Sequence, residues 1–164
     1  MPNKIGMLWR KSVKNIEKLY QQISEVPNDE FYLLEPEFCE ELYYHISIDN
    51  RPLCVTAFIT ILNWFAMSQR SGVWTFYEST SPKDIELTIH FLEQTGEDEL
   101  ASIFRYGAHD YQNPKYNGNW NYPDEWIDEA NKIDDWITNH ESWLYMWERK
   151  LLIDNKELLC SLVN

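Results

Sequence analysis

The longest stretch without a charged residue runs from residue 52 to residue 69, in a chain in which 25% of residues are charged. Pro52, which follows the capping candidate Asn50, fits the first turn of a helix, because the missing N–H of proline removes no hydrogen bond there. The apolar residues of the stretch surround the helix axis, which is typical of a helix packed on every side. They are Leu53, Val55, Phe58, Ile59, Ile61, Leu62, Trp64, Phe65 and Met67. We therefore predict a buried central helix around which the other elements pack.

A membrane span is the alternative for this stretch, because its length is near the lower limit for crossing a bilayer. Thr56, Thr60 and Asn63 interrupt it, and no other part of the sequence resembles a membrane protein. We therefore favour a core helix and expect no membrane partner.

Helical spacing of apolar residues predicts further helices on both sides of the central one. Gly72 permits a bend that returns the aromatic residues after it to the core, and Gly96 is a helix stop. No stretch alternates convincingly as a strand, and we find no internal repeat. We expect an all-α protein with a single compact domain over residues 1–164 and about seven to nine helices. The helices expected beside the central one cover about 9–24, 36–47, 82–95, 97–106, 123–137, 141–152 and 156–162.

The charge balance is strongly acidic, with 27 Asp and Glu against 14 Lys and Arg and a formal net charge of −13. Such a charge argues against direct binding to nucleic acid or to anionic membranes, and it favours a basic protein partner. Aromatic residues make up 15% of the chain, so the composition is not that of a disordered acidic tail. Residues 1–24 are basic although the chain as a whole is acidic, since they contain five basic residues and one acidic residue.

The cysteines Cys39, Cys54 and Cys160 are odd in number and lack the close pairs of zinc or redox motifs. We expect them to be buried thiols. The first residues are not followed by a long apolar run with a small-residue cleavage site, so we expect no secretion signal and a cytoplasmic location. No metal or other cofactor is expected.

Acidic residues gather on helix faces opposite the apolar positions. In the helix expected at 36–47, Phe38, Cys39, Leu42, Tyr43 and Ile46 are expected to point inward and the glutamates outward. Carboxylates one turn apart lie about 6 Å apart along a helix axis, while a DNA strand carries a phosphate about every 3.4 Å. Helices of this kind can present negative charge to a surface that normally binds phosphate, and the same composition also suits solvated helix faces that only keep the protein soluble. The acids concerned are Glu37, Glu40 and Glu41; Asp124, Asp128 and Asp135, with Glu125, Glu129 and Asp134 beside them; and Glu97, Asp98 and Glu99, which the helix dipole also favours in a first turn.

Enzyme motifs are weak by comparison. Glu41 and His45, like Glu86 and His90, place a carboxylate and an imidazole one turn apart, a spacing that could hold a metal ion. The Glu-x-x-His spacing of di-iron bundles is missing, and His109 and His140 have no matched carboxylate partner in the sequence. No glycine-rich phosphate loop or nucleophile elbow is present. We therefore expect no enzyme, and a carboxylate/His metalloenzyme is the least favoured alternative.

Residues 71–80, which we call the aromatic turn, resemble a motif of a known protein family. The sequence Ser71-Gly72-Val73-Trp74-Thr75-Phe76-Tyr77-Glu78-Ser79-Thr80 resembles a motif of bacterial helical proteins that reads Gly-Gly-aromatic-x-Gln, two aromatics, a variable residue and Asn-Ser. The uncharged helix before it and residues 92–96 match the same layout. Size, acidity and a Trp-rich second half further resemble the dimeric DNA-mimic members of that family from bacterial pathogens, over most of residues 30–160. The chain departs from the motif at Ser71, Val73, Thr75 and Ser79, so we do not carry over any activity that those positions serve in the wider family.

The resemblance implies an all-helical homodimer that occupies the DNA-binding surface of a helix-turn-helix transcription factor and keeps it off its operator. Tryptophan and tyrosine are then expected in the core and in the dimer contact. An acidic immunity or antitoxin-like protein that binds a basic enzyme is the main alternative. In the DNA-mimic hypothesis Glu37, Glu40, Glu41, Asp124, Asp128 and Asp135 stand in for phosphates, with Glu97, Asp98, Glu99, Glu125 and Glu129 as second choices.

Overall fold

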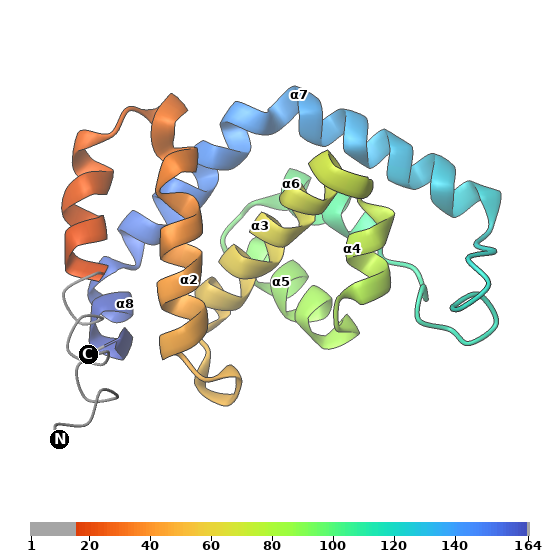
Figure 1. Ribbon diagram of the computed structural model, residues 1–164, viewed down its shortest axis with the longest axis horizontal. Coiled ribbons are helices and arrows are strands. Elements are labelled where there is room, and N and C mark those ends of the chain that lie inside the picture. The colour runs from red at the N-terminus through yellow and green to blue at the C-terminus, as the bar shows by residue number, and fades with distance from the viewer. Residues whose placement is uncertain (1–15, 164) are drawn as a thin grey trace, which may run out of the picture. The chain divides into compact units, whose positions relative to one another are not determined.

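The computed structural model describes residues 16–163, and all the regular secondary structure in that range is helical (Figure 1). The prediction of an all-α protein with seven to nine helices is confirmed. The helix expected over residues 9–24 begins outside the described residues, and residues 16–25 are helical. The other elements are η1 (Asn28–Leu33), α2 (Glu35–His45), η2 (Ile48–Asn50), α3 (Leu53–Ser71), α4 (Trp74–Ser79), α5 (Pro82–Gln94), α6 (Asp98–Tyr106), α7 (Asp124–Asp154) and α8 (Lys156–Val163).

The described chain divides into two compact units. The central unit comprises residues 53–141, and the terminal unit comprises residues 16–52 together with residues 142–163. Helix α7 contributes its first part to the central unit and its second part to the terminal unit. That the whole chain behaves as a single domain stays a prediction.

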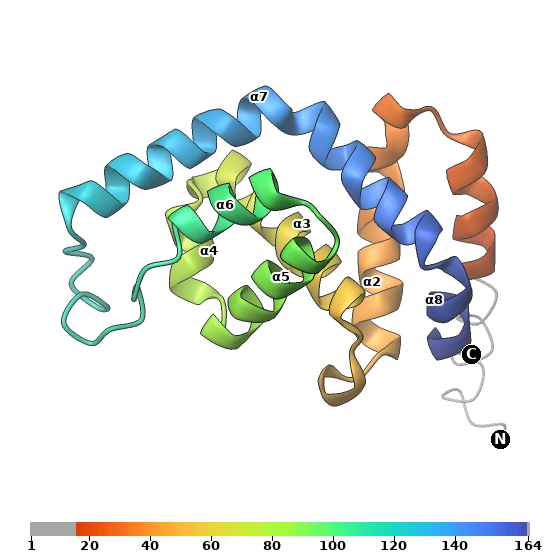
Figure 2. The same cartoon turned by 180° about the vertical axis from the view of Figure 1, so that it is seen from behind.

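The uncharged stretch forms α3, the buried helix of the central unit. It packs against α4 and α5, and α5 packs in turn against α6, as both views of the ribbon show (Figures 1 and 2). Its polar residues Thr56 and Thr60 are buried with the apolar ones, while Asn63 is exposed. The start of the helix differs from the prediction, because Asn50 lies in η2 and Pro52 precedes the first helical residue. No helix among residues 16–163 has the length and apolar character needed to span a bilayer.

The aromatic turn re-enters the core as predicted. Gly72 adopts a φ of 90°, a left-handed backbone that a side chain would disfavour. Phe76 and Tyr77 of α4, each at most 2% exposed, then fill the space beside α3. The N-terminus of α4 has no cap from its own side chains. Instead Oδ1 of Asp134, on α7, accepts the N–H of Val73 at 3.0 Å and the hydroxyl of Ser68 at 2.5 Å.

Tyr77 holds three helices of the central unit together. Its hydroxyl accepts the indole N–H of Trp64 at 2.9 Å and donates to the carbonyl of Phe104 at 2.6 Å. Gly107, at the end of α6, lies so close that an added Cβ would be 2.5 Å from Cε2 of Tyr77 and 2.6 Å from Cδ1 of Ile133. A glycine is therefore needed here for close packing, since its backbone φ of −93° is open to any residue.

The region after residue 137 differs from the prediction of two separate helices, because α7 is continuous from Asp124 to Asp154. Thr138, Asn139 and His140 lie at the expected break. Thr138 Oγ1 donates to the carbonyl of Asp134 at 2.9 Å, and Asn139 Nδ2 donates to that of Asp135 at 2.8 Å. These side chains bond to the helix's own backbone, and no glycine or proline interrupts it. The polar run is therefore compatible with a helix interior.

The terminal unit packs residues 16–25 against α2 and the second part of α7. The ring of Tyr20 meets that of Phe38 edge-on at 5.1 Å, and its hydroxyl donates to the carbonyl of Leu152 at 2.9 Å. Phe38, Leu42 and Ile46 are buried as expected. Tyr43 is 52% exposed, so its predicted inward position is wrong. It lies about 100° around the helix from Leu42, which takes it off the apolar face.

Candidate partner-binding surface

Four acidic residues of α7 form what we call the α7 acidic face. Asp124, Glu125, Asp128 and Asp135 are all exposed. Among residues 16–163, no Lys, Arg or His lies within ion-pair distance of any of them. The helix dipole favours acids in a first turn, which accounts for Asp124 and Glu125. Asp128 and Asp135 lie beyond that turn, so the dipole does not account for them.

The helix period explains why these acids are exposed. At 3.6 residues per turn, Asp124, Asp128 and Asp135 fall within about 40° of one another around the axis and span roughly 17 Å along it. The opposite side of the helix carries Ala130, Ile133 and Ile137, each at most 1% exposed. Including Glu125, there is about one carboxylate per 4–6 Å of axis, which approaches the phosphate spacing of a DNA strand.

The acids of α6 extend this surface. Asp98 and Glu99 lie exposed in the first turn of α6. A carboxylate oxygen of Glu99 accepts the indole N–H of Trp136 at 3.3 Å and lies 4.0 Å from Nε2 of His140. Because Trp136 directly follows Asp135 but lies about 100° around the helix from it, Glu99 lies beside the end of the α7 acidic face that holds Asp135. Glu97 is half-buried just before the helix.

Two acids that flank the face in sequence do not belong to it. Asp134 and Glu129 fall about 100° and 120° away from the centre of the face, toward the core. Asp134 is occupied by Ser68 and Val73, and its pKa is raised because burial penalises the charged form more than these hydrogen bonds favour it. Neither acid offers a free carboxylate to a partner, so we remove Glu129 from the candidate set.

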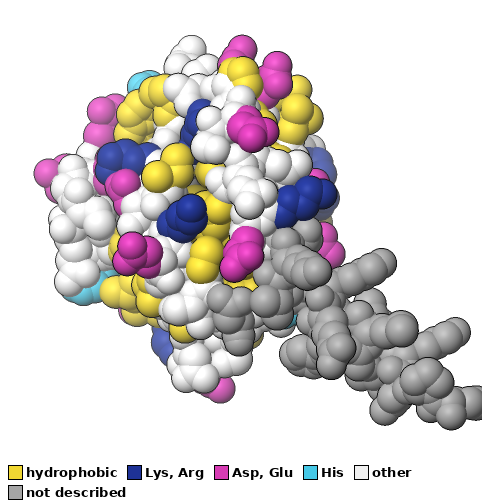
Figure 3. Space-filling model, turned by 90° about the vertical axis from the view of Figure 1, so that its left-hand side faces the viewer, with side chains coloured by type: hydrophobic (Ala, Val, Ile, Leu, Met, Phe, Trp, Pro, Cys, Tyr) yellow, Lys and Arg dark blue, Asp and Glu magenta, His cyan; other side chains and the backbone are white. Residues whose placement is uncertain are grey.

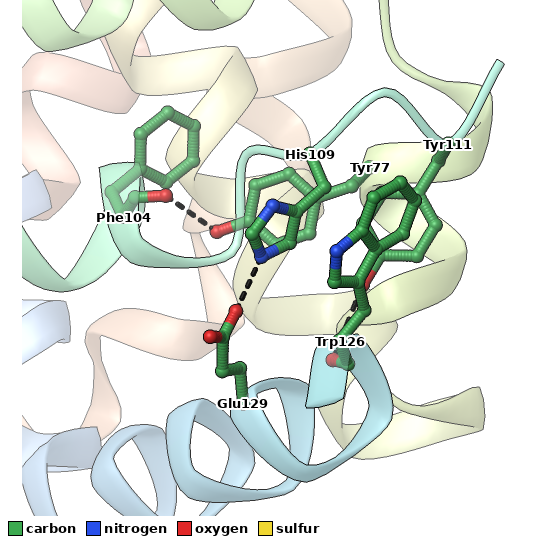
Figure 4. A network of polar contacts seen from close by, with 6 residues as sticks. All are labelled: Tyr77, Phe104, His109, Tyr111, Trp126 and Glu129. Atoms are coloured by element: carbon green, nitrogen blue, oxygen red, sulfur yellow. Dashed lines mark hydrogen bonds and ion pairs between the residues drawn. The ribbon is translucent and has the colours of Figure 1, made fainter. Parts of the chain in front are cut away.

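Glu129 belongs to an aromatic network between α7 and the loop before it (Figure 4). Its carboxylate is paired with Nε2 of His109. The imidazole of His109 stacks on the indole of Trp126, with centroids 4.7 Å apart and planes 4° from parallel. Tyr111 packs against both rings. Sequence reasoning missed this pairing, because the two partners are 20 residues apart and joined only by a loop.

The predicted acids of α2 belong to the terminal unit, whereas the α7 acidic face belongs to the central unit. Glu37 and Glu40 are exposed. The side chain of Glu41 is only 11% exposed and pairs with His45 at 3.5 Å, so it is a poor phosphate substitute. On the face drawn in Figure 3, acidic side chains lie apart from one another, with basic and hydrophobic side chains between them.

Two further acids, which the sequence analysis did not single out, are buried in the terminal unit. Glu148 is fully buried and Glu35 is 8% exposed. The pKa of Glu148 is raised well above its usual value, first by burial and then by the neighbouring carboxyl of Glu35, whose own pKa burial also raises. Two buried carboxyls side by side favour a state in which one of them is protonated. The spacing of Leu144, Glu148 and Leu152 along one helix face is the signal that could have identified a buried glutamate.

Among the described residues, no group of three or more His, Cys, Asp or Glu is arranged to hold a metal ion. A cavity of about 380 Å³ lies beside α5 and includes His109 and Arg105 in its wall. Arg105 is paired with Glu93 at 2.5 Å, and His109 with Glu129, so these groups already have partners within the chain. Cys54 is buried, whereas Cys39 and Cys160 are only half-buried, unlike the predicted buried thiols.

Comparison of the chain with protein-family models, curated proteins and solved structures gives no significant match. The family resemblance read from the aromatic turn therefore stays a prediction, and so do the homodimer and the bacterial transcription factor that it implies.

Proposed function

We propose that this protein is a DNA mimic that binds the DNA-binding surface of a helix-turn-helix transcription factor and prevents the factor from binding its operator. The observation that carries the proposal is the α7 acidic face. Its carboxylates are exposed, unpaired among the described residues and fixed on one side of a helix. A surface built to bind phosphates with Lys, Arg and helix N-termini can accept such a row of anions.

The distribution of ion pairs supports this choice of surface. Other exposed acids form ion pairs within the chain. Glu93 pairs with Arg105 at 2.5 Å, and Asp154 pairs with Lys150 at 2.7 Å. The α7 acidic face keeps its charge available, although Asp128 repels Asp124 and Glu125 one turn before it, and Lys132 is the one basic residue between Asp128 and Asp135. Such a face costs a small amount of helix stability, which a role in binding a basic partner would explain. In this proposal Asp124, Asp128 and Asp135 are the main phosphate substitutes, with Glu125, Asp98 and Glu99 beside them.

The test is a gel-shift competition between this protein and operator DNA. The factor is first isolated from host cells on the immobilised protein and identified by mass. Labelled operator DNA is then bound by that factor, and rising amounts of the acidic protein are added. We expect displacement of the DNA at a few equivalents of protein. Failure of the wild-type protein to displace the operator would reject the proposed function. Capture of a basic enzyme in place of a DNA-binding protein would favour the immunity-like alternative.

Charge-neutral variants locate the surface. The triple substitution Asp124→Asn, Asp128→Asn and Asp135→Asn removes three exposed charges, each worth about 0.2–1 kcal/mol, so competition is expected to weaken roughly tenfold. The matched control changes Asp29→Asn, Glu30→Gln and Asp49→Asn, which are exposed acids of the terminal unit. It alters the net charge equally and is expected to compete as the wild-type protein does. If both triple variants lost the same amount of competition with operator DNA, binding would depend on the total charge of the protein and not on the α7 acidic face.

A further inference from the structure

Trp120 combines two unusual features in the loop between α6 and α7. It is 66% exposed, whereas the other tryptophans among residues 16–163 are buried or half-buried. It is also the one described non-glycine residue with a positive φ, at 54°. A left-handed backbone is unfavourable for a bulky side chain, and such conformations persist where the surrounding structure holds them, often at functional sites.

Neighbouring groups fix the position of the exposed indole. The N–H of Trp120 donates to the carbonyl of Tyr116 at 3.1 Å, which closes the turn. The ring lies edge-on to Trp74, with centroids 5.7 Å apart and planes at 68°. Trp74 is in turn 6.0 Å from the ring of Tyr122. The indole is therefore held in place by an aromatic cluster while most of its surface remains open to solvent.

The chemistry around Trp120 is acidic. Asp124 is four positions further along the chain, a distance of at most about 14 Å if the chain were fully extended. Residues 107–135 hold seven Asp and Glu against two Lys. One of these lysines, Lys115, already places its ammonium group 5.0 Å from the centroid of Tyr116. A cationic partner that approaches the α7 acidic face brings its Lys and Arg side chains within reach of the indole.

We infer that Trp120 is an aromatic anchor of the partner-binding surface and receives an Arg or Lys side chain of the basic partner on its ring. This inference rests on the proposed function and names the contact beside the phosphate-mimicking carboxylates. Tryptophan is the side chain that gives the strongest cation–π contact, and it is enriched among the residues that dominate interface energies. The neighbouring carboxylates Asp124 and Glu125 attract the cation, while the ring contacts its planar or aliphatic part.

The experiment measures binding of a deca-arginine peptide by titration calorimetry at low salt, and repeats the operator competition with the same variants. Trp120→Ala removes the ring. Trp120→Asn also removes it but suits a left-handed backbone, so it keeps the turn. Trp120→Phe retains an aromatic face. The matched control is Tyr106→Ala, which removes another aromatic side chain of the central unit, 42% exposed on α6. Far-UV circular dichroism and Tm confirm that each variant is folded.

We expect Trp120→Ala and Trp120→Asn to weaken peptide binding about two- to tenfold, in keeping with a cation–π contact at a partly exposed site. Trp120→Phe is expected to bind within about twofold of the wild-type protein, and Tyr106→Ala to bind equally well. Wild-type affinity in folded Trp120→Ala would overturn the inference, even if the protein displaces operator DNA. If the wild-type protein displaces no operator, the proposed function fails, and the peptide titration still decides whether Trp120 binds cations.

Discussion

Asp134 on α7 accepts the backbone N–H of Val73 at 3.0 Å, and so caps α4 from a helix 61 residues away in sequence. The same oxygen accepts the hydroxyl of Ser68, at the end of α3. One carboxylate thus fixes the turn that follows the buried helix. Its neighbour Asp135 is exposed and makes no such contact.

Asp134→Ala is therefore expected to destabilise the protein by about 1–3 kcal/mol, because the N–H of Val73 loses its partner. Asp135→Ala removes the same charge from the exposed side of the helix and is expected to change the free energy of unfolding by about 0.5 kcal/mol or less. Urea denaturation followed by circular dichroism measures both. Equal effects of the two substitutions would contradict the capping role of Asp134.

Tyr77→Phe is expected to lower the free energy of unfolding by about 1–3 kcal/mol. It leaves the buried indole N–H of Trp64 and the carbonyl of Phe104 without the hydroxyl that both of them bind. Tyr116→Phe is a suitable control, because Tyr116 is only half-buried. The difference in the urea midpoint at an unchanged slope gives the effect. A Tyr77→Phe protein as stable as the wild type would show that the network contributes no net stability.

Gly107→Ala is expected to destabilise by about 1–3 kcal/mol, because its Cβ would overlap the ring of Tyr77 and the side chain of Ile133. Gly96 offers the contrast, since its φ is 78° and a Cβ there would meet nothing within 4 Å. Asparagine, which tolerates a left-handed backbone, should be accepted at Gly96 and rejected at Gly107. Thermal unfolding of Gly96→Asn and Gly107→Asn tests this pair.

Glu148 makes stability depend on pH in a direction opposite to that of a paired surface carboxylate. Its folded pKa is raised above the usual 4.5, so its contribution is fully present below about pH 4.5 and is lost as the pH rises through the folded pKa. Each unit of that rise corresponds to about 1.4 kcal/mol. Glu148→Gln, which stays neutral, is expected to gain stability relative to the wild-type protein as the pH rises from about 4.5 through the folded pKa of Glu148.

The control for that pH series is Glu37→Gln, an exposed glutamate on α2. Its free energy of unfolding should follow the wild-type curve at each pH. A constant difference between Glu148→Gln and the wild-type protein across the series would mean that Glu148 is ionised in the folded state throughout.

Binding to the proposed partner is expected to weaken steeply as salt rises, because exposed charges are screened over about 10 Å at 0.1 M ionic strength. The logarithm of the dissociation constant, measured between 50 and about 300 mM NaCl, should have a smaller slope for the Asp124, Asp128 and Asp135 triple variant than for the wild-type protein. Parallel slopes would place the contact elsewhere on the molecule.

The sequence predicted those parts of the fold that depend on local periodicity. The apolar residues around α3 and the acids opposite Ile133 on α7 follow from residue spacing alone, because a helix turns by a constant angle. Tyr43 shows where this reasoning stops. It lies at the edge of the apolar face of α2, where the neighbouring elements decide whether it is covered.

The parts that could not be predicted depend on partners distant in the sequence. Asp134 and Asp135 are identical in type and adjacent, yet one is a cap and the other is exposed. Glu129 contacts His109 only because the loop of residues 107–123 returns to α7. The continuity of α7 through residues 138–140 also depends on side-chain bonds to its own backbone, which the residue types permit without requiring.

The buried carboxyl pair has a consequence for the solution in which the protein folds. Above about pH 4.5 the carboxyls of Glu35 and Glu148 ionise in the unfolded chain, whereas the raised pKa of Glu148 keeps this group protonated to a higher pH in the folded chain. Folding therefore takes up protons from the buffer in the pH range between the unfolded and the folded pKa of Glu148. The unfolding enthalpy should accordingly differ between phosphate and Tris, whose heats of ionisation are unequal, and this difference should disappear in Glu148→Gln.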